Sequence, residues 1–287
     1  NEPPQVLFEP AEGRYVGEID LHFDAKRLLV SMPGSFNRFQ VFELDLEHQE
    51  GRWRVTGLRE LPLILEPDID NYDACYLPDD RVVFTSTAPF VGVPCVYGQS
   101  HVTNTYRWDP KDGHIRQLTV DQEHNWHPSV LNNGRVLYLR WEYTDLPHAH
   151  SRILFSMNPD GTNQMAYYGS NSYFPNSFFY ARAIPGHPTK VVGIASGHHG
   201  TRRSGRLLIV DPAVGRHEAQ GVVQEIPPTH QTIEPTIRDE LVDGVWPQFL
   251  TPWPLSEKYF LVSCKPSPEQ SWGIYLADIF GNLVLIC

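Results

Sequence analysis

The sequence predicts an all-β fold, a β-propeller built from four-stranded antiparallel blades. Short apolar runs alternate with turn signals along the whole chain, and no stretch has the pattern of a long helix. The pattern recurs every ~50 residues, as in kelch-like or somewhat longer propeller blades. Residues 126–141 show half of one unit most clearly: a short strand, the turn Asn132-Asn133-Gly134, and a second strand rich in β-branched and aromatic residues.

Five such units align within a single domain, residues 1–287. Their approximate bounds are 16–66, 70–120, 124–169, 173–228 and 243–287. The third strand of each unit ends in a residue type that accepts local backbone hydrogen bonds in a hairpin turn. These residues are Asp45, Asp109, Asn158, Asp211 and Asp278.

Five units admit two interpretations, a complete five-bladed ring or a part of a six-bladed ring. In the second, residues 5–8 would be the last strand of a missing blade. Nothing resembles a strand exchanged between the ends to close a ring, and the last unit stops abruptly at Cys287. We therefore expect five blades excised from a six-bladed ring of a longer polypeptide.

Composition narrows the classes of function. The formal net charge of −11 argues against nucleic acid or an anionic membrane as the main partner. No apolar run is long enough to span a bilayer, and the opening NEPPQVLFEP is not a signal peptide. The four cysteines form neither CxxC nor the haem-attachment motif CxxCH. GxGxxG, GxxxxGK[ST] and GxSxG are also absent, so phosphate loops and the nucleophile elbow are not indicated.

The long predicted loops share one face of the blades, and tight turns such as 77–80 and 132–134 lie on the other. The long-loop face is therefore the expected functional face. Side chains that bind zinc or related metals gather there. The candidates are Asp73 and His127 at the start of two inner strands, His198 and His199 in the fourth return loop, and Asp20 at a third inner strand. The alternative is that these groups only bond water and loop backbone.

A second set of residues on this face would bind an anionic ligand. Arg140 and Glu142 adjoin the third return loop, and Arg202 and Arg203 lie in the basic segment GTRRSGR. Arginine grips a carboxylate or a haem propionate through paired hydrogen bonds. The competing interpretation is a solvated basic loop.

Several stretches resemble a known family. HNWHPSVLNNGRVLYLRWEYTD from His124, IPGHPTKVVGIASGHHG from Ile184, DGVWPQFL from Asp243 and PLSEKYFLVSCKP from Pro254 are similar to the middle domain of the hydrazine synthase alpha subunit family. The turn DPKDGHIRQLT also resembles TolB-type propellers. The resemblance implies a six-bladed propeller that lies beside haem-bearing regions and helps to hold a zinc ion near the active haem.

The expected function is a non-catalytic module of a larger extracytoplasmic protein, periplasmic or extracellular and linked to haem. Its partners would be neighbouring domains of the same polypeptide or partner subunits, and zinc is the expected cofactor. The alternative is a self-contained lyase or hydrolase with a metal-assisted site on the same face. No catalytic residue is assigned, because no nucleophile or acid–base pair with a clear partner is evident in the sequence.

Overall fold

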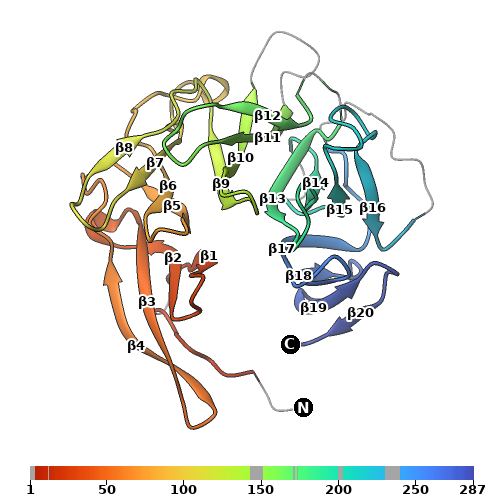
Figure 1. Ribbon diagram of the computed structural model, residues 1–287, viewed down its shortest axis with the longest axis horizontal. Coiled ribbons are helices and arrows are strands. Elements are labelled where there is room, and N and C mark those ends of the chain that lie inside the picture. The colour runs from red at the N-terminus through yellow and green to blue at the C-terminus, as the bar shows by residue number, and fades with distance from the viewer. Residues whose placement is uncertain are drawn as a thin grey trace. The chain divides into compact units, whose positions relative to one another are not determined.

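The protein is described by a computed structural model that covers residues 4–11, 13–142, 151–170, 172, 174–199, 203–229 and 240–287 (Figure 1). Within these residues the fold is all-β, and its only helical segments are two 3-10 turns at Ser35–Asn37 and Pro94–Val96. The predicted class, all-β with four-stranded antiparallel sheets, is therefore confirmed.

Strands that follow each other in the sequence pair antiparallel, in sets of four. The first set is β1 (Gly17–Leu21), β2 (Arg27–Pro33), β3 (Phe39–Gln49) and β4 (Arg52–Glu60). The second is β5 (Asn71–Tyr76), β6 (Val82–Ser86), β7 (Asn104–Trp108) and β8 (Ile115–Gln117). The third is β9 (Asn125–Val130), β10 (Val136–Glu142), β11 (Ser151–Met157) and β12 (Met165–Tyr168). The fourth is β13 (Ser177–Ala183), β14 (Val191–Ser196), β15 (Arg206–Val210) and β16 (Val222–Ile226), and the fifth is β17 (Gln248–Pro254), β18 (Tyr259–Lys265), β19 (Gly273–Asp278) and β20 (Leu283–Leu285).

Three of these sets form separate four-stranded sheets, and the third and fourth join into one eight-stranded sheet. The junction is a single parallel pair, Arg152 with Ser177. The six-blade interpretation predicts a strand at residues 5–8, but these residues form no strand in the structure. The number of blades and the closure of a ring stay predictions.

The chain divides into two compact units. Unit 1 comprises Asn1–Pro128 and Asn158–Thr162, and unit 2 comprises Ser129–Met157 and Asn163–Cys287. Each has its own apolar core, because alternate strand residues point to one face of each sheet. The core of unit 1 includes Leu29, Val41, Tyr76, Val82 and Phe84. The core of unit 2 includes Leu137, Leu154, Phe178, Val191 and Leu208.

The first strand of every set carries the same irregularity. One residue in each has a left-handed backbone conformation without being glycine. These residues are Glu18, Asp73, His127, Tyr180 and Thr251, with φ of 47°, 54°, 52°, 55° and 45°. The register of β1, β5, β13 and β17 shifts across this residue, which marks a β-bulge. A left-handed conformation is costly for side chains of this kind, and such strain is a pointer to a functional position.

Candidate functional site

Asp73 and His127 are brought together in unit 1. The Asp73 Oδ2 atom lies 3.0 Å from His127 Nδ1 and also accepts a hydrogen bond from the His127 backbone N–H. Both residues are buried, at 7% and 8% exposure. The Asp73 carboxylate therefore fixes both the backbone and the imidazole ring of His127.

The backbone irregularities of the inner strands explain the contact between Asp73 and His127. Asp73 and His127 occupy the same left-handed position in β5 and β9, two successive inner strands. The Asp73 backbone N–H in turn donates to the Ser31 hydroxyl on β2, at 2.9 Å. The inner strands β5 and β9 are thus each hydrogen-bonded to a side chain of the preceding four-stranded set.

Asp20 is not the exact counterpart of these two residues. Glu18 holds the bulge position in β1, and Asp20 comes two residues later. The Asp20 carboxylate accepts a hydrogen bond from the Tyr76 backbone N–H at 3.0 Å, where β5 ends. It therefore joins the first two sets of strands, as Asp73 joins the second and third.

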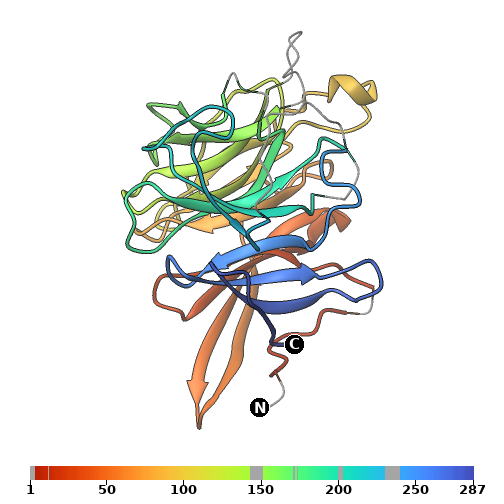
Figure 2. The same ribbon diagram turned by 90° about the vertical axis from the view of Figure 1, so that its right-hand side faces the viewer.

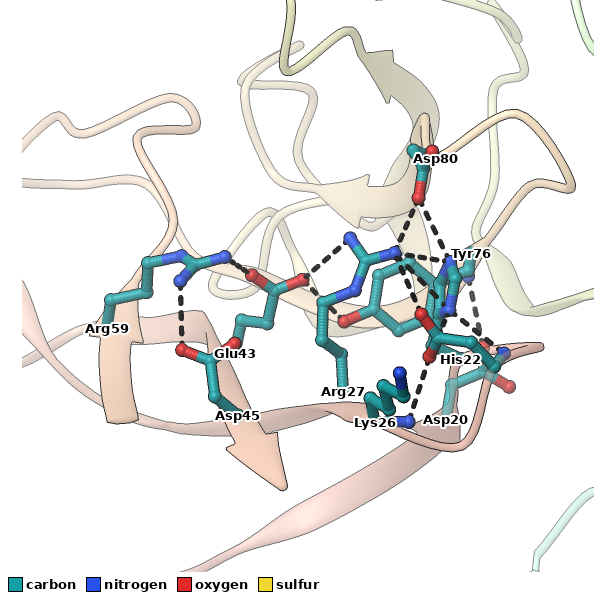
Figure 3. Close-up of polar contacts among 10 residues, drawn as sticks. Asp20, His22, Lys26, Arg27, Glu43, Asp45, Arg59, Tyr76 and Asp80 are labelled. Carbon is teal, nitrogen blue, oxygen red and sulfur yellow. Dashed lines mark hydrogen bonds and ion pairs between the residues drawn. The ribbon is translucent and has the colours of Figure 1, made fainter. Parts of the chain in front are cut away.

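A network of charged side chains, which we call the charged seam, lies between the first two sets (Figure 3). We define it by Arg27, Glu43, Arg59, Tyr76 and Asp80, with His22, Asp24 and Asp45 around them. Glu43 is 4% exposed, accepts a hydrogen bond from the Tyr76 hydroxyl at 2.6 Å and pairs with Arg59. Arg27 reaches Asp80 at 2.5 Å and lies 3.9 Å from Glu43.

This network shifts the ionisation of its members. Burial, and then the hydrogen bond to Glu43, raises the pKa of Tyr76 far above its ordinary value. The hydrogen bond from Arg27 lowers the pKa of the Asp80 carboxyl. Tyr76 therefore stays a neutral donor, and the arrangement suits a structural link better than proton transfer.

A stack of aromatic and cationic side chains, the aromatic seam, lies between the two sets of the eight-stranded sheet in unit 2. The Arg152 guanidinium lies 4.8 Å from the centre of the Trp141 ring and donates to the His198 carbonyl at 2.8 Å. The His198 ring is 5.5 Å from Trp141 and 4.3 Å from the His199 ring. His199 is exposed, whereas Trp141 is buried.

The residues predicted to bind an anion are divided. Arg140 pairs with Ile153 and lies over the Phe155 ring at 4.8 Å, and Glu142 follows on the same face of β10. Trp141 and Arg152 point to the opposite face, because successive strand residues alternate. Arg203 lies 5.5 Å from the Phe179 ring. Arg202 falls outside the described residues.

The predicted metal ligands do not form a complete set. Over the described ranges, no three His, Cys, Asp or Glu side chains gather closely enough to hold a metal ion. Asp73 and His127 supply one pair in unit 1, and His198 and His199 supply another in unit 2. Zinc sites usually have four ligands, so neither pair is a site by itself. The zinc prediction remains a prediction.

Sequence reasoning missed the charged seam and the bulges. Glu43 and Arg59 are cross-strand partners, a signal that a register prediction for β3 and β4 would have revealed. Tyr76 and Asp80 come from another set of strands, and no local pattern connects them to Arg27. None of the left-handed residues at the bulges is glycine, so the usual sequence sign of a bulge is missing.

Comparisons with known proteins support the class of fold. No family model and no curated protein sequence matches the chain. Its structure is similar to a chain of hydrazine synthase from Kuenenia stuttgartiensis, with a TM-score of 0.67 and 15% identity over 95% of this chain and 39% of that chain. An oligogalacturonate lyase in complex with manganese matches with a TM-score of 0.50 and 13% identity, over 93% of this chain and 65% of the other. A putative TolB from Agrobacterium tumefaciens, at a TM-score of 0.47 and 13% identity, matches over 68% of this chain and 60% of its own.

The first two of these matches show a propeller-type, all-β fold. The resemblance to hydrazine synthase predicted from the sequence is confirmed, and at this level of identity it is a likeness of fold. The chain spans 39% of the hydrazine synthase chain that it matches. In the part of the chain that the structure describes, no helix is long and apolar enough to cross a membrane.

Proposed function

We propose that the chain is a non-catalytic propeller module that supports other parts of a larger protein. The observation that carries the proposal is the use of the inner-strand carboxylates. Asp20 and Asp73 each accept a backbone N–H from the next set of strands. Carboxylates used in this way hold strands together and are poorly placed to attack or protonate a substrate.

The larger protein is proposed from the likeness to hydrazine synthase. The chain corresponds to 39% of that chain, so in that protein this fold lies within a longer polypeptide. In the same proposal, the five four-stranded sets are blades of a six-bladed ring. The protein is extracytoplasmic, and its partners are neighbouring domains, including a haem-bearing one, or partner subunits.

Cross-linking of the intact gene product tests this proposal. A lysine-reactive cross-linker followed by mass spectrometry should join Lys190 or Lys258 to residues outside this 287-residue chain. Fractionation should place the product outside the cytoplasm, with the pyridine haemochrome spectrum of a haem protein. Cross-links confined to these residues, in a product that purifies alone, would show the module proposal to be wrong.

Metal binding forms a separate part of the proposal. A carboxylate on one ring nitrogen is the usual means of orienting a histidine that ligates a metal through the other. Asp73 holds His127 in this manner. Calorimetric titration with zinc should show binding that is lost in His127→Ala and weakened in Asp73→Asn. Unchanged titration curves in both variants would exclude a zinc site at this pair.

The alternative is a self-contained lyase or hydrolase with a metal-assisted site. The same Asp73–His127 pair favours it, because a carboxylate that orients imidazole is common in acid–base catalysis. A manganese-bound lyase shares the fold. Incubation of the purified chain and Mn²⁺ with a panel of uronate oligosaccharides and esters would detect turnover. Activity that is lost in His127→Gln would support the enzyme and contradict the module.

A further inference from the structure

The outermost strand of the first set is unusually long. β4 has nine residues, whereas the outermost strands β8, β12, β16 and β20 have three, four, five and three. β4 pairs with β3, and β2 pairs with the other side of β3. The pairing of β2 with β3 ends at Arg27 with Asp45. Beyond that point β3 and β4 continue as a ribbon of their own, from Leu46 with Val55 to Gln49 with Arg52, and this ribbon projects from the sheet (Figure 2).

The end of β4 has two different faces. Arg52 and Arg54 lie opposite Gln49 and Glu47 on one face. Trp53 lies opposite His48 on the other face, is 39% exposed, and has its ring centre 5.1 Å from that of His48. Neither Arg52 nor Arg54 uses its side chain in a hydrogen bond or ion pair with any described residue. Two exposed arginines thus flank a tryptophan in a chain of net charge −11.

The free edge of β4 is available to a further strand. The Trp53 carbonyl accepts a hydrogen bond from the Gln5 side-chain amide at 2.6 Å, so this carbonyl points away from β3. In an antiparallel strand the N–H and C=O of one residue point to the same side. The Trp53 N–H therefore also points outward, and an incoming strand would replace one side-chain contact from Gln5.

We propose that β4 binds an extended acidic segment of a partner protein by strand addition. Backbone hydrogen bonds along the edge would supply affinity, and alternate side chains would supply specificity. Carboxylates at every second position would face Arg52 and Arg54, and the apolar residues between them would cover Trp53 and Val55. This surface is distinct from the residues on which the proposed module function rests.

Two other occupants fit less well. In a face-matched antiparallel pairing of β4 with a second copy, arginine would lie opposite arginine, for example Arg52 opposite Arg54. Like charges in directly opposite positions are destabilising. Nucleic acid would need more than two cationic contacts to overcome an acidic protein. Charge on an edge strand can also serve only to prevent pairing, and in that case no peptide would bind.

A labelled peptide of about eight alternating Glu and Val residues, the length of a common strand, tests the proposal. Fluorescence anisotropy with the 287-residue chain should show saturable binding. The Arg52→Glu/Arg54→Glu variant should raise the Kd roughly tenfold, the effect of losing two exposed charge pairs and adding repulsion. Arg116→Glu is the matched control, because Arg116 is an exposed arginine on the three-residue edge strand β8, and its Kd should not change.

Backbone pairing is tested separately from charge. A peptide of the same sequence, N-methylated at alternate residues, should not bind, because it cannot donate to the edge. Circular dichroism verifies that Arg52→Gln/Arg54→Gln, a second variant without added acid, keeps its fold, and this variant should also bind more weakly.

Four outcomes would overturn the proposal: equal binding of the N-methylated peptide, equal effects of the β4 and Arg116 substitutions, binding as tight for a Lys-Val peptide or a single-stranded RNA, and no binding at all. Concentration-dependent dimers that Trp53→Ala abolishes, with no peptide binding, would assign the edge to a second copy instead.

Discussion

The charged seam of unit 1 and the aromatic seam of unit 2 each join two successive sets of four strands, but they do so through different interactions. In unit 1 the buried Glu43 carboxylate connects Arg59 on its own sheet to Tyr76 on the next. In unit 2 Arg152 is stacked on Trp141 and bonded to the His198 backbone. The first link depends on ionised carboxylates, whereas in the second the Arg152 guanidinium stays charged at any ordinary pH.

The difference predicts which substitutions should destabilise each unit. Loss of a buried hydrogen-bond acceptor destabilises the fold, because the buried donor is left without a partner. A buried aromatic ring is costly to remove because it leaves a cavity. The two seams should therefore respond to different substitutions and to different solution conditions.

The largest effect is expected for Trp141→Ala. Trp141 is 4% exposed, and truncation of a buried tryptophan costs about 3–5 kcal/mol of unfolding free energy. Urea denaturation followed by circular dichroism measures the change. Trp272→Ala, at a tryptophan of the same unit with 43% exposure, is the control and should cost much less. Similar losses in both variants would mean that the aromatic seam contributes nothing of its own.

Glu43→Ala should come next, with a loss of about 1–3 kcal/mol, because it leaves the buried Tyr76 hydroxyl without its acceptor. The half-exposed Arg59 keeps its ion pair with Asp45 and adds little to this loss. Glu47→Ala, at an exposed residue of the same strand, should stay within about 0.5 kcal/mol of the parent.

Buried thiols can show which unit opens in the Glu43→Ala variant. Cys75 lies in unit 1 and Cys264 in unit 2, and burial raises the pKa of Cys264 to about 12. In a Cys95→Ser/Cys287→Ser background, Glu43→Ala should speed the reaction of Cys75 with a thiol reagent more than that of Cys264. A faster Cys264 would contradict the assignment of the effect to unit 1.

The smallest effect is expected for the Arg27–Asp80 ion pair, whose contribution to stability depends on pH. The hydrogen bond from Arg27 lowers the pKa of Asp80 in the folded protein. Such a group stabilises the fold above its unfolded pKa of about 3.9, and this contribution is lost as the pH falls through the lower, folded value. Asp80→Asn should reduce the stability at neutral pH by less than about 1 kcal/mol, because the carboxylate is half exposed, and should make little difference at the lowest pH.

The test is the urea midpoint as a function of pH below neutrality. Asp68→Asn, at an exposed carboxylate of the same unit, is the control. If both variants give the same pH profile, the Arg27–Asp80 pair does not contribute to the charged seam.

Much of the fold could be predicted because its signals are local. Turn residues such as Asn133 and Gly134, together with alternating strands, revealed each set of four. The candidate pair was also accessible, because Asp73 and His127 enter equivalent strands at the same point, and the structure brings them into contact. Asp20 was misplaced by two residues because the bulge in β1 begins at Glu18, which no glycine marks. The charged seam needed the spatial neighbours of Arg27, which the sequence does not reveal.

The bulge has a consequence for mutations that change the length of the chain. A bulge contributes one extra residue, so the inward and outward positions of an inner strand exchange when it is passed. Deleting a single residue at Asp73 or Tyr180 would remove the extra residue and yield an ordinary strand, in which the side chains on both flanks keep their faces and their partners on the next strand. Between the second and third strands, where pairing is regular, for example from Tyr259 with Asp278 to Cys264 with Gly273, one deleted residue has no such place to be absorbed. A deletion scan would therefore give a five-fold repeating profile, with its period set by the inner strands.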